Sequence, residues 1–126
     1  LRKPLQNPEA CRWVADHADQ AWLSVIVLAE IRLGIENPAA AARRPDLERW
    51  LADIEIAHAS RTLSFDREAA HIFGQLIARR KLAKQETKML DAQIAAQALA
   101  KGAVVATRNV ADFAWTGVRA VNPWGD

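Results

Sequence analysis

Hydrophobic residues recur along this chain in two patterns, one typical of helices and the other typical of short buried strands. The helical spacing predicts helices at about residues 8–18, 25–36, 67–84 and 89–101. A further helix is predicted from Pro45, because apolar residues recur there at intervals of three and four, at Leu47, Trp50, Leu51 and Ile54.

Residues suited to helix ends stand where these helices are expected to begin and stop. Ser24 and Asp66 are good N-caps, because their side-chain oxygens accept hydrogen bonds from the free amides of a first turn. Asn37 and Pro38 are expected to end the helix over 25–36. This helix is apolar nearly all round, so we expect it to occupy the centre of the fold.

Short apolar runs between the predicted helices are expected to be strands. They lie at Trp22–Leu23, Arg61–Phe65, Ala103–Ala106 and Val118–Val121. These are short apolar runs rather than alternating patterns, most clearly Ala103–Ala106, which indicates a sheet covered on both faces. Strands that alternate with helices predict an α/β fold, a three-layer α/β/α sandwich with a short, mainly parallel sheet. No repeat or linker interrupts the pattern, so residues 1–126 are expected to form a single domain.

Composition narrows the class of protein. Of the 126 residues, 51% are hydrophobic and 25% are charged, which supports one apolar core and argues against disorder. The longest uninterrupted apolar run, Val25–Ala29, is far shorter than the roughly 20 residues that span a bilayer. Cys11 is the single cysteine and no signal-peptide pattern is visible, so we expect a protein of the reducing cytoplasm.

Positive charge is clustered, although the net charge is only +2. Arg43 and Arg44 form one cluster, and a longer stripe contains Arg79, Arg80, Lys81, Lys84 and Lys88. Such clusters permit binding to nucleic-acid phosphates, and they also occur on solvated helix faces.

Candidate chemistry rests on acidic residues, because the glycine-rich nucleotide loops, the paired-histidine metal motif and the serine-hydrolase motif are missing from the sequence. Glu30 lies in the otherwise apolar helix over 25–36, where an unpaired carboxylate would be costly. A cation, a metal or water must therefore satisfy it. The alternative is an arginine ion pair or a helix face that opens to solvent.

Further polar residues stand where ligands of parallel sheets gather. Asp91 is in the first turn of the helix over 89–101, where an acid is also ordinary dipole chemistry. Asn109 and Asp112 follow the strand over 103–106, in a loop that a simple Asn/Asp turn would also explain. If Glu30, Asp91 and this loop converge, they could bind a hard cation such as Mg²⁺ for phosphodiester cleavage. Spacing alone leaves that convergence open.

Several segments together resemble one protein family. Trp22–Ile35, Leu90–Ala100 and Val104–Phe113 resemble characteristic blocks of PIN-domain ribonucleases, specifically the VapC-type toxins of bacterial toxin–antitoxin pairs. Gly117-Val118 and Val121–Trp124 are also typical of that family. The similarity runs in order through essentially the whole chain, so the resemblance implies a PIN-like fold.

The resemblance implies a role for each acidic residue. Glu30 corresponds to the family's acid on the second helix, and Asp91 to the acid that opens the helix before the fourth strand. Asp112 is a further candidate ligand, and Asn109 falls where some members carry a fourth acid. We therefore expect Glu30, Asp91, Asp112 and Asn109 to be catalytic, with the three carboxylates holding Mg²⁺ or Mn²⁺.

The resemblance also implies partners. Toxins of this type cut tRNA, rRNA or mRNA, dimerise, and are inhibited by a VapB-type antitoxin that lies across the active groove. Basic residues are expected to bind RNA phosphates, the candidates being Arg79, Arg80, Lys81, Lys84 and Arg108. Trp115 is expected to be buried, the alternative being that it stacks on a base.

The chain departs from the family pattern at its amino end. The family's first strand, which ends in Asp-Thr-Asn and supplies a metal ligand, would lie a few residues before Leu1. We expect the native protein to begin upstream. The alternative is a catalytically impaired PIN-like module that binds an antitoxin or RNA without cleaving it, which Asn109 also favours.

Overall fold

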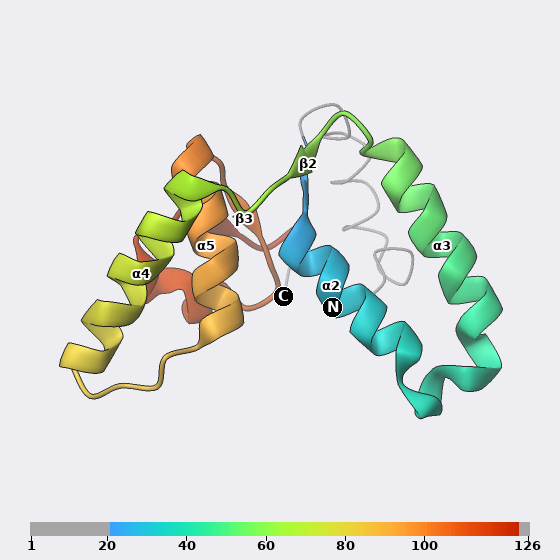
Figure 1. Ribbon diagram of the computed structural model, residues 1–126, viewed down its shortest axis with the longest axis horizontal. Helices are drawn as coiled ribbons and strands as arrows, with labels where there is room; N and C mark the ends of the chain where they lie inside the picture. The colour runs from blue at the N-terminus through green and yellow to red at the C-terminus, as the bar shows by residue number, and fades with distance from the viewer. Residues whose placement is uncertain (1–20, 124–126) are drawn as a thin grey trace.

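The computed structural model describes residues 21–123, and the helix predicted over 8–18 lies outside them. The elements in order are β1 (Leu23–Ser24), α2 (Val25–Glu36), the 3₁₀ helix η2 (Pro38–Arg43), α3 (Arg44–Ala57), β2 (Thr62–Leu63), α4 (Arg67–Leu82), α5 (Met89–Lys101), β3 (Val105–Ala106), the 3₁₀ helix η3 (Val110–Thr116) and β4 (Ala120–Val121). Figure 1 shows two halves, one with α2 and α3 and the other with α4 and α5. No helix in this part of the chain is long and apolar enough to cross a membrane.

The strands pair in parallel, as the sequence predicts. β1 lies beside β2, with Ser24 opposite Leu63, and β3 lies beside β4, with Val105 opposite Ala120. Each strand has only two residues, and within the described residues the four strands form two separate pairs. In both pairs a helix-containing crossover joins the strands, so the expected α/β class is confirmed.

The predicted caps explain where the helices begin. The Ser24 hydroxyl accepts hydrogen bonds from the amides of Ile26 and Val27, at 3.1 and 3.4 Å, and so starts α2. Asp66 caps α4 by accepting a hydrogen bond from the amide of Ala69 at 3.0 Å. Helix α2 begins and ends where the sequence predicts, at residues 25 and 36.

Each half of the described structure is built around its own apolar core. The larger core lies between α4, α5 and η3, where Leu76, Ala95 and Ala96 are fully buried and Phe113 is nearly so. The buried alanines of α5 carry little side-chain bulk, which allows α4 to approach closely. The smaller core lies between α2 and α3.

Helix α2 differs from its predicted central position. Only Ile31 and Ile35 are buried, while Leu33 on the opposite face is 74% exposed. The reason is that α2 contacts α3 and, elsewhere along its length, α5, so residues 25–28 are half-buried while the face with Leu33 remains at the surface in the described structure.

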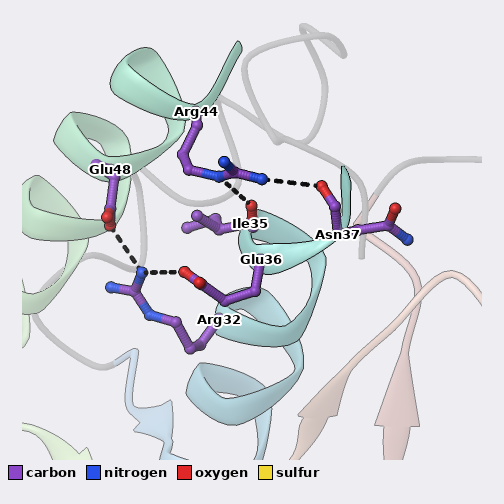
Figure 2. Close-up of polar contacts among 6 residues, drawn as sticks. All are labelled: Arg32, Ile35, Glu36, Asn37, Arg44 and Glu48. Carbon is purple, nitrogen blue, oxygen red and sulfur yellow. Dashed lines mark hydrogen bonds and ion pairs between the residues drawn. The ribbon is translucent and has the colours of Figure 1, made fainter. Parts of the chain in front are cut away.

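Arginines fasten α2 to α3, as Figure 2 shows. The Arg44 guanidinium donates hydrogen bonds to the carbonyls of Ile35 and Asn37, at 2.8 and 3.1 Å, and so satisfies carbonyls left free where α2 ends. Arg32 forms ion pairs with Glu36 on its own helix and with Glu48 on α3, at 3.3 and 2.9 Å. The exposed ion pairs add little stability, whereas the carbonyl contacts fix the corner between the helices.

A lysine in the loop before α5 adopts a left-handed backbone conformation, whose cost can be tested. Lys84 has a φ of +57°, in the left-handed region that costs an L-residue about 1–2 kcal/mol. We predict that Lys84→Gly raises the free energy of unfolding by up to about 1 kcal/mol, measured by urea denaturation. Lys81→Gly, in regular helix, is the control and should lower it by about 0.5–1 kcal/mol. Equal losses in both variants would contradict the assigned backbone conformation.

Candidate active site

Three carboxylates come from three different elements and influence one another electrostatically. Glu30 is in the second turn of α2, Asp91 is in the first turn of α5, and Asp112 is in the first turn of η3. Burial raises the pKa of Glu30 above its usual value, and the negative charge of Asp91 raises it further. Burial likewise raises the pKa of Asp91, and the charge of Asp112 adds to that effect. The charge of Asp91 thus acts on Glu30, and that of Asp112 acts on Asp91.

The surroundings of Glu30 test one of the alternatives left open by its sequence position, an ion pair with an arginine. Its side chain is partly buried, and within residues 21–123 no arginine or lysine forms an ion pair with it. Arg32, two positions along the helix, pairs with Glu36 and Glu48 instead. The arginine pair considered for Glu30 is thus not formed among the described residues.

The β3–η3 loop presents its polar residues at the carboxyl end of β3. The amide of Asn109 donates a hydrogen bond to the Thr107 hydroxyl at 3.0 Å, and the amide of Asp112 donates to the Asn109 carbonyl at 3.0 Å. The loop therefore continues into a 3₁₀ helix, which the sequence did not predict. Asn109 and Asp112 are both exposed, and the Asn109 side chain makes no capping hydrogen bond to η3.

Two basic residues act around the start of α5: Lys88 through its charge, and Arg80 through contacts with the preceding loop. Lys88 is the N-cap residue of α5, and its positive charge opposes part of the rise in the pKa of Asp91. The Arg80 guanidinium lies 4.5 Å from the ring centroid of Trp115 in η3 and donates hydrogen bonds to Gln85 and Glu86, both at 2.8 Å. Arg80, predicted as a phosphate ligand, is thereby used to hold the loop before Asp91 against η3.

The arrangement offers oxygen ligands that a hard cation prefers, because carboxylates suit Mg²⁺ and Mn²⁺. In the described part of the chain, however, no three acidic, histidine or cysteine residues lie close enough to form a complete metal-binding group. The electrostatic effects link Glu30 with Asp91 and Asp91 with Asp112. Carboxylate oxygens are donors of the type that a divalent cation prefers.

The comparison with known families decides the classification. A family model described as the PIN domain matches residues 3–114. This chain belongs to the PIN-domain family. The resemblance inferred from Glu30, Asp91 and the surrounding blocks is therefore confirmed at the level of the family.

Named relatives of this PIN-domain protein agree with the VapC-type resemblance. The chain is 34% identical to VapC ribonuclease Y4jK of Sinorhizobium fredii, over 89% of this chain and 81% of that protein. It is 32% identical to toxin FitB of Neisseria gonorrhoeae, over 98% of this chain and 91% of that protein. The crystal structure of FitAcB from N. gonorrhoeae superposes with a TM-score of 0.83 at 30% identity, covering 95% of this chain and 88% of that chain.

Gln97 was not predicted from the sequence; it is a buried polar residue on α5, the helix that also carries Asp91. Its side chain is only 1% exposed and hydrogen-bonds both Ser24 and Leu63. The available signal was a single amide within a run of alanines on the buried face of α5, since such an amide needs partners.

The raised pKa of Glu30 predicts a pH-dependent stability. Because the folded protein holds this proton more tightly than the unfolded chain, ionised Glu30 destabilises the fold above its raised pKa. We predict that Glu30→Gln raises the free energy of unfolding at pH 7–8 in EDTA, and that the gain shrinks as the pH falls through that pKa. Urea denaturation at a series of pH values, from pH 8 down through the raised pKa of Glu30, measures this gain in the free energy of unfolding.

The matched control is Glu86→Gln, which removes an exposed carboxylate from the loop between α4 and α5. This variant should change stability little at any pH in the series. A uniform loss of stability in Glu30→Gln, independent of pH, would contradict the electrostatic description of the site.

Proposed function

We propose that this protein is the toxin of a type II toxin–antitoxin pair, an endoribonuclease that uses Mg²⁺, or Mn²⁺, to hydrolyse RNA phosphodiester bonds. The observation that carries the proposal is the electrostatic coupling of Asp91 to both Glu30 and Asp112, acids from three separate elements of a PIN domain. The 34% identity to a protein named VapC ribonuclease supports RNA hydrolysis, and the 32% identity to toxin FitB supports the toxin role.

The proposed roles follow from the chemistry of the side chains. Glu30, Asp91 and Asp112 would hold the cation, whose positive charge offsets their mutual repulsion. When bound, Mg²⁺ supplies Lewis acidity for the hydrolysis of the phosphodiester. The Asn109 amide, exposed in the same loop, is suited to donate a hydrogen bond to a phosphate oxygen of the RNA.

Exposed basic residues near the end of α4 are proposed to bind the RNA backbone. Arg79 and Lys81 lie in the last turn of α4, and Lys84 lies just beyond it; all three are exposed. Phosphate contacts of this kind make affinity fall as salt rises. Arg80 is excluded from this set, since Trp115 and the loop already engage its guanidinium.

The proposal includes the partners expected from the family resemblance. The toxin would act on cytoplasmic tRNA, rRNA or mRNA as a homodimer, with a VapB-type antitoxin as its inhibitor. A protein purified with its antitoxin is therefore expected to be inactive until the antitoxin is removed.

We predict that Asp91→Asn abolishes RNA cleavage while the protein remains folded. The substitution removes the charge of the acid that is coupled to both Glu30 and Asp112, and we expect the cleavage rate to fall by about 100-fold or more. The assay uses protein from the complete reading frame, freed of antitoxin, on tRNA, rRNA and mRNA with Mg²⁺ or with EDTA. Circular dichroism confirms folding.

Glu86→Gln is the matched charge-neutralising control, and its cleavage rate should equal that of the wild type. Cleavage by Asp91→Asn at the wild-type rate would show that the activity comes from a contaminant or from another site, and would overturn the assignment.

The second candidate is a PIN-like module that binds antitoxin or RNA without cleavage. It is favoured by the observation that no three candidate ligands among the described residues lie close enough to form a metal-binding group. It predicts RNA or antitoxin binding that is indifferent to EDTA, and no cleavage of any RNA class by the folded wild type.

A further inference from the structure

Gln97 forms a buried bridge between elements that lie far apart in the sequence. Its side-chain oxygen accepts a hydrogen bond from the Ser24 hydroxyl at 2.5 Å, and its side-chain nitrogen donates one to the Leu63 carbonyl at 3.0 Å. Ser24 and Leu63 face each other in the parallel pair formed by β1 and β2. A single amide on α5 therefore spans the carboxyl ends of two strands that belong to the other half of the molecule.

The orientation of this amide is fixed by the chemistry of its partners. The Leu63 carbonyl can only accept, so the nitrogen of Gln97 must face it and the oxygen must face Ser24. The Ser24 hydroxyl donates to Gln97 while it accepts from the amides of Ile26 and Val27 at the start of α2. All the hydrogen-bonding capacity of the hydroxyl is used, so a shift of either helix breaks a buried hydrogen bond.

The two helices joined by this bridge carry two partly buried acids. Ser24 begins α2, and Glu30 lies six residues later; Asp91 lies six residues before Gln97 on α5. Six residues of helix are about 9 Å, so each acid is less than two turns from its end of the bridge. The two helices also contact each other directly, but the buried apolar residues of each belong to a separate core, with α3 for α2 and with α4 for α5.

We infer that Gln97 and Ser24 are positioning residues that fix the start of α2 against α5 and so set the separation of Glu30 and Asp91. The inference rests on the proposed function, in which these two carboxylates hold one divalent cation. An apolar side chain would fill the same buried space on α5, but only the amide defines a direction and a distance to both strand ends. Partners that orient metal ligands typically affect metal affinity by about 10–100-fold.

The test begins with Gln97→Met, which keeps the length and bulk of the side chain and removes both hydrogen bonds. Ser24→Ala removes the bridge and the α2 cap together, whereas Ser24→Thr keeps the hydroxyl and should restore both. Asp66→Ala is the stability control, because it removes a helix cap of the same kind from α4 and leaves β1 and α2 untouched. It also removes the exposed ion pair of Asp66 with Lys101 at the far end of α5, at 3.7 Å. The cost of losing a cap is about 1 kcal/mol, and Ser24→Ala should cost more than Asp66→Ala because it also leaves the buried oxygen of Gln97 without its hydrogen bond.

Two measurements are made on the full chain. Calorimetric titration with Mn²⁺ should show affinity reduced about tenfold or more in Gln97→Met and Ser24→Ala, and unchanged in Ser24→Thr and Asp66→Ala. Residual dipolar couplings of backbone amides, recorded in EDTA, should show a changed orientation of α2 relative to α5 in the same two variants only. Wild-type orientation in Gln97→Met, or wild-type Mn²⁺ affinity in it, would overturn the inference.

The two measurements separate this inference from the proposed function. If the wild type binds no Mn²⁺, the proposed function fails, and the couplings recorded in EDTA still decide whether the bridge sets the helix orientation. If the wild type binds Mn²⁺ and Asp66→Ala loses affinity as much as Gln97→Met, the bridge contributes only stability and the inference fails alone.

Discussion

Partial burial of two carboxylates is the constraint around which the candidate site is built. Burial raises the pKa of Glu30 on α2 and of Asp91 on α5, and the charges of Asp91 and Asp112, respectively, add to the two shifts. Carboxylates with raised pKa values cost stability when they ionise, and such groups cluster at functional sites. Under the proposed function, a bound cation would offset their charge.

Polar contacts hold the elements that carry the acids in place. The Arg80 guanidinium holds the loop before Asp91 against Trp115 of η3, while Gln97 joins α5 to the beginning of α2. Each half of the molecule has its own apolar core, and the acid-bearing helices α2 and α5 are linked by direct contact and by the buried hydrogen bonds of Gln97.

Much of the local structure followed from the sequence, because it depends on neighbouring residues. Ser24 and Asp66 cap helices as their chemistry predicts, and α5 has its predicted bounds. The strands are shorter than the apolar runs suggested, because pairing and not hydrophobicity sets their length. The 3₁₀ helix η3 was not predicted, since its backbone hydrogen bonds leave no periodic apolar pattern.

The candidate site was predictable in its residue types and less so in its geometry. An acid in the apolar helix α2 and another at the start of α5 could be chosen from the sequence, but their electrostatic coupling required the fold. Gln97 illustrates the limit, because its partners lie 73 and 34 residues away and no local rule could name them. The surface position of Leu33 was likewise set by tertiary packing on one face of α2.

The most direct test of this account is whether a divalent cation stabilises the folded protein through Asp91. Thermal unfolding is recorded for the wild type and for Asp91→Asn, with millimolar Mg²⁺ or Mn²⁺ and with EDTA. The account predicts that the cation raises the Tm of the wild type and leaves that of Asp91→Asn nearly unchanged, because only the intact acidic group binds it. An equal shift in both proteins, or none in the wild type, would contradict it.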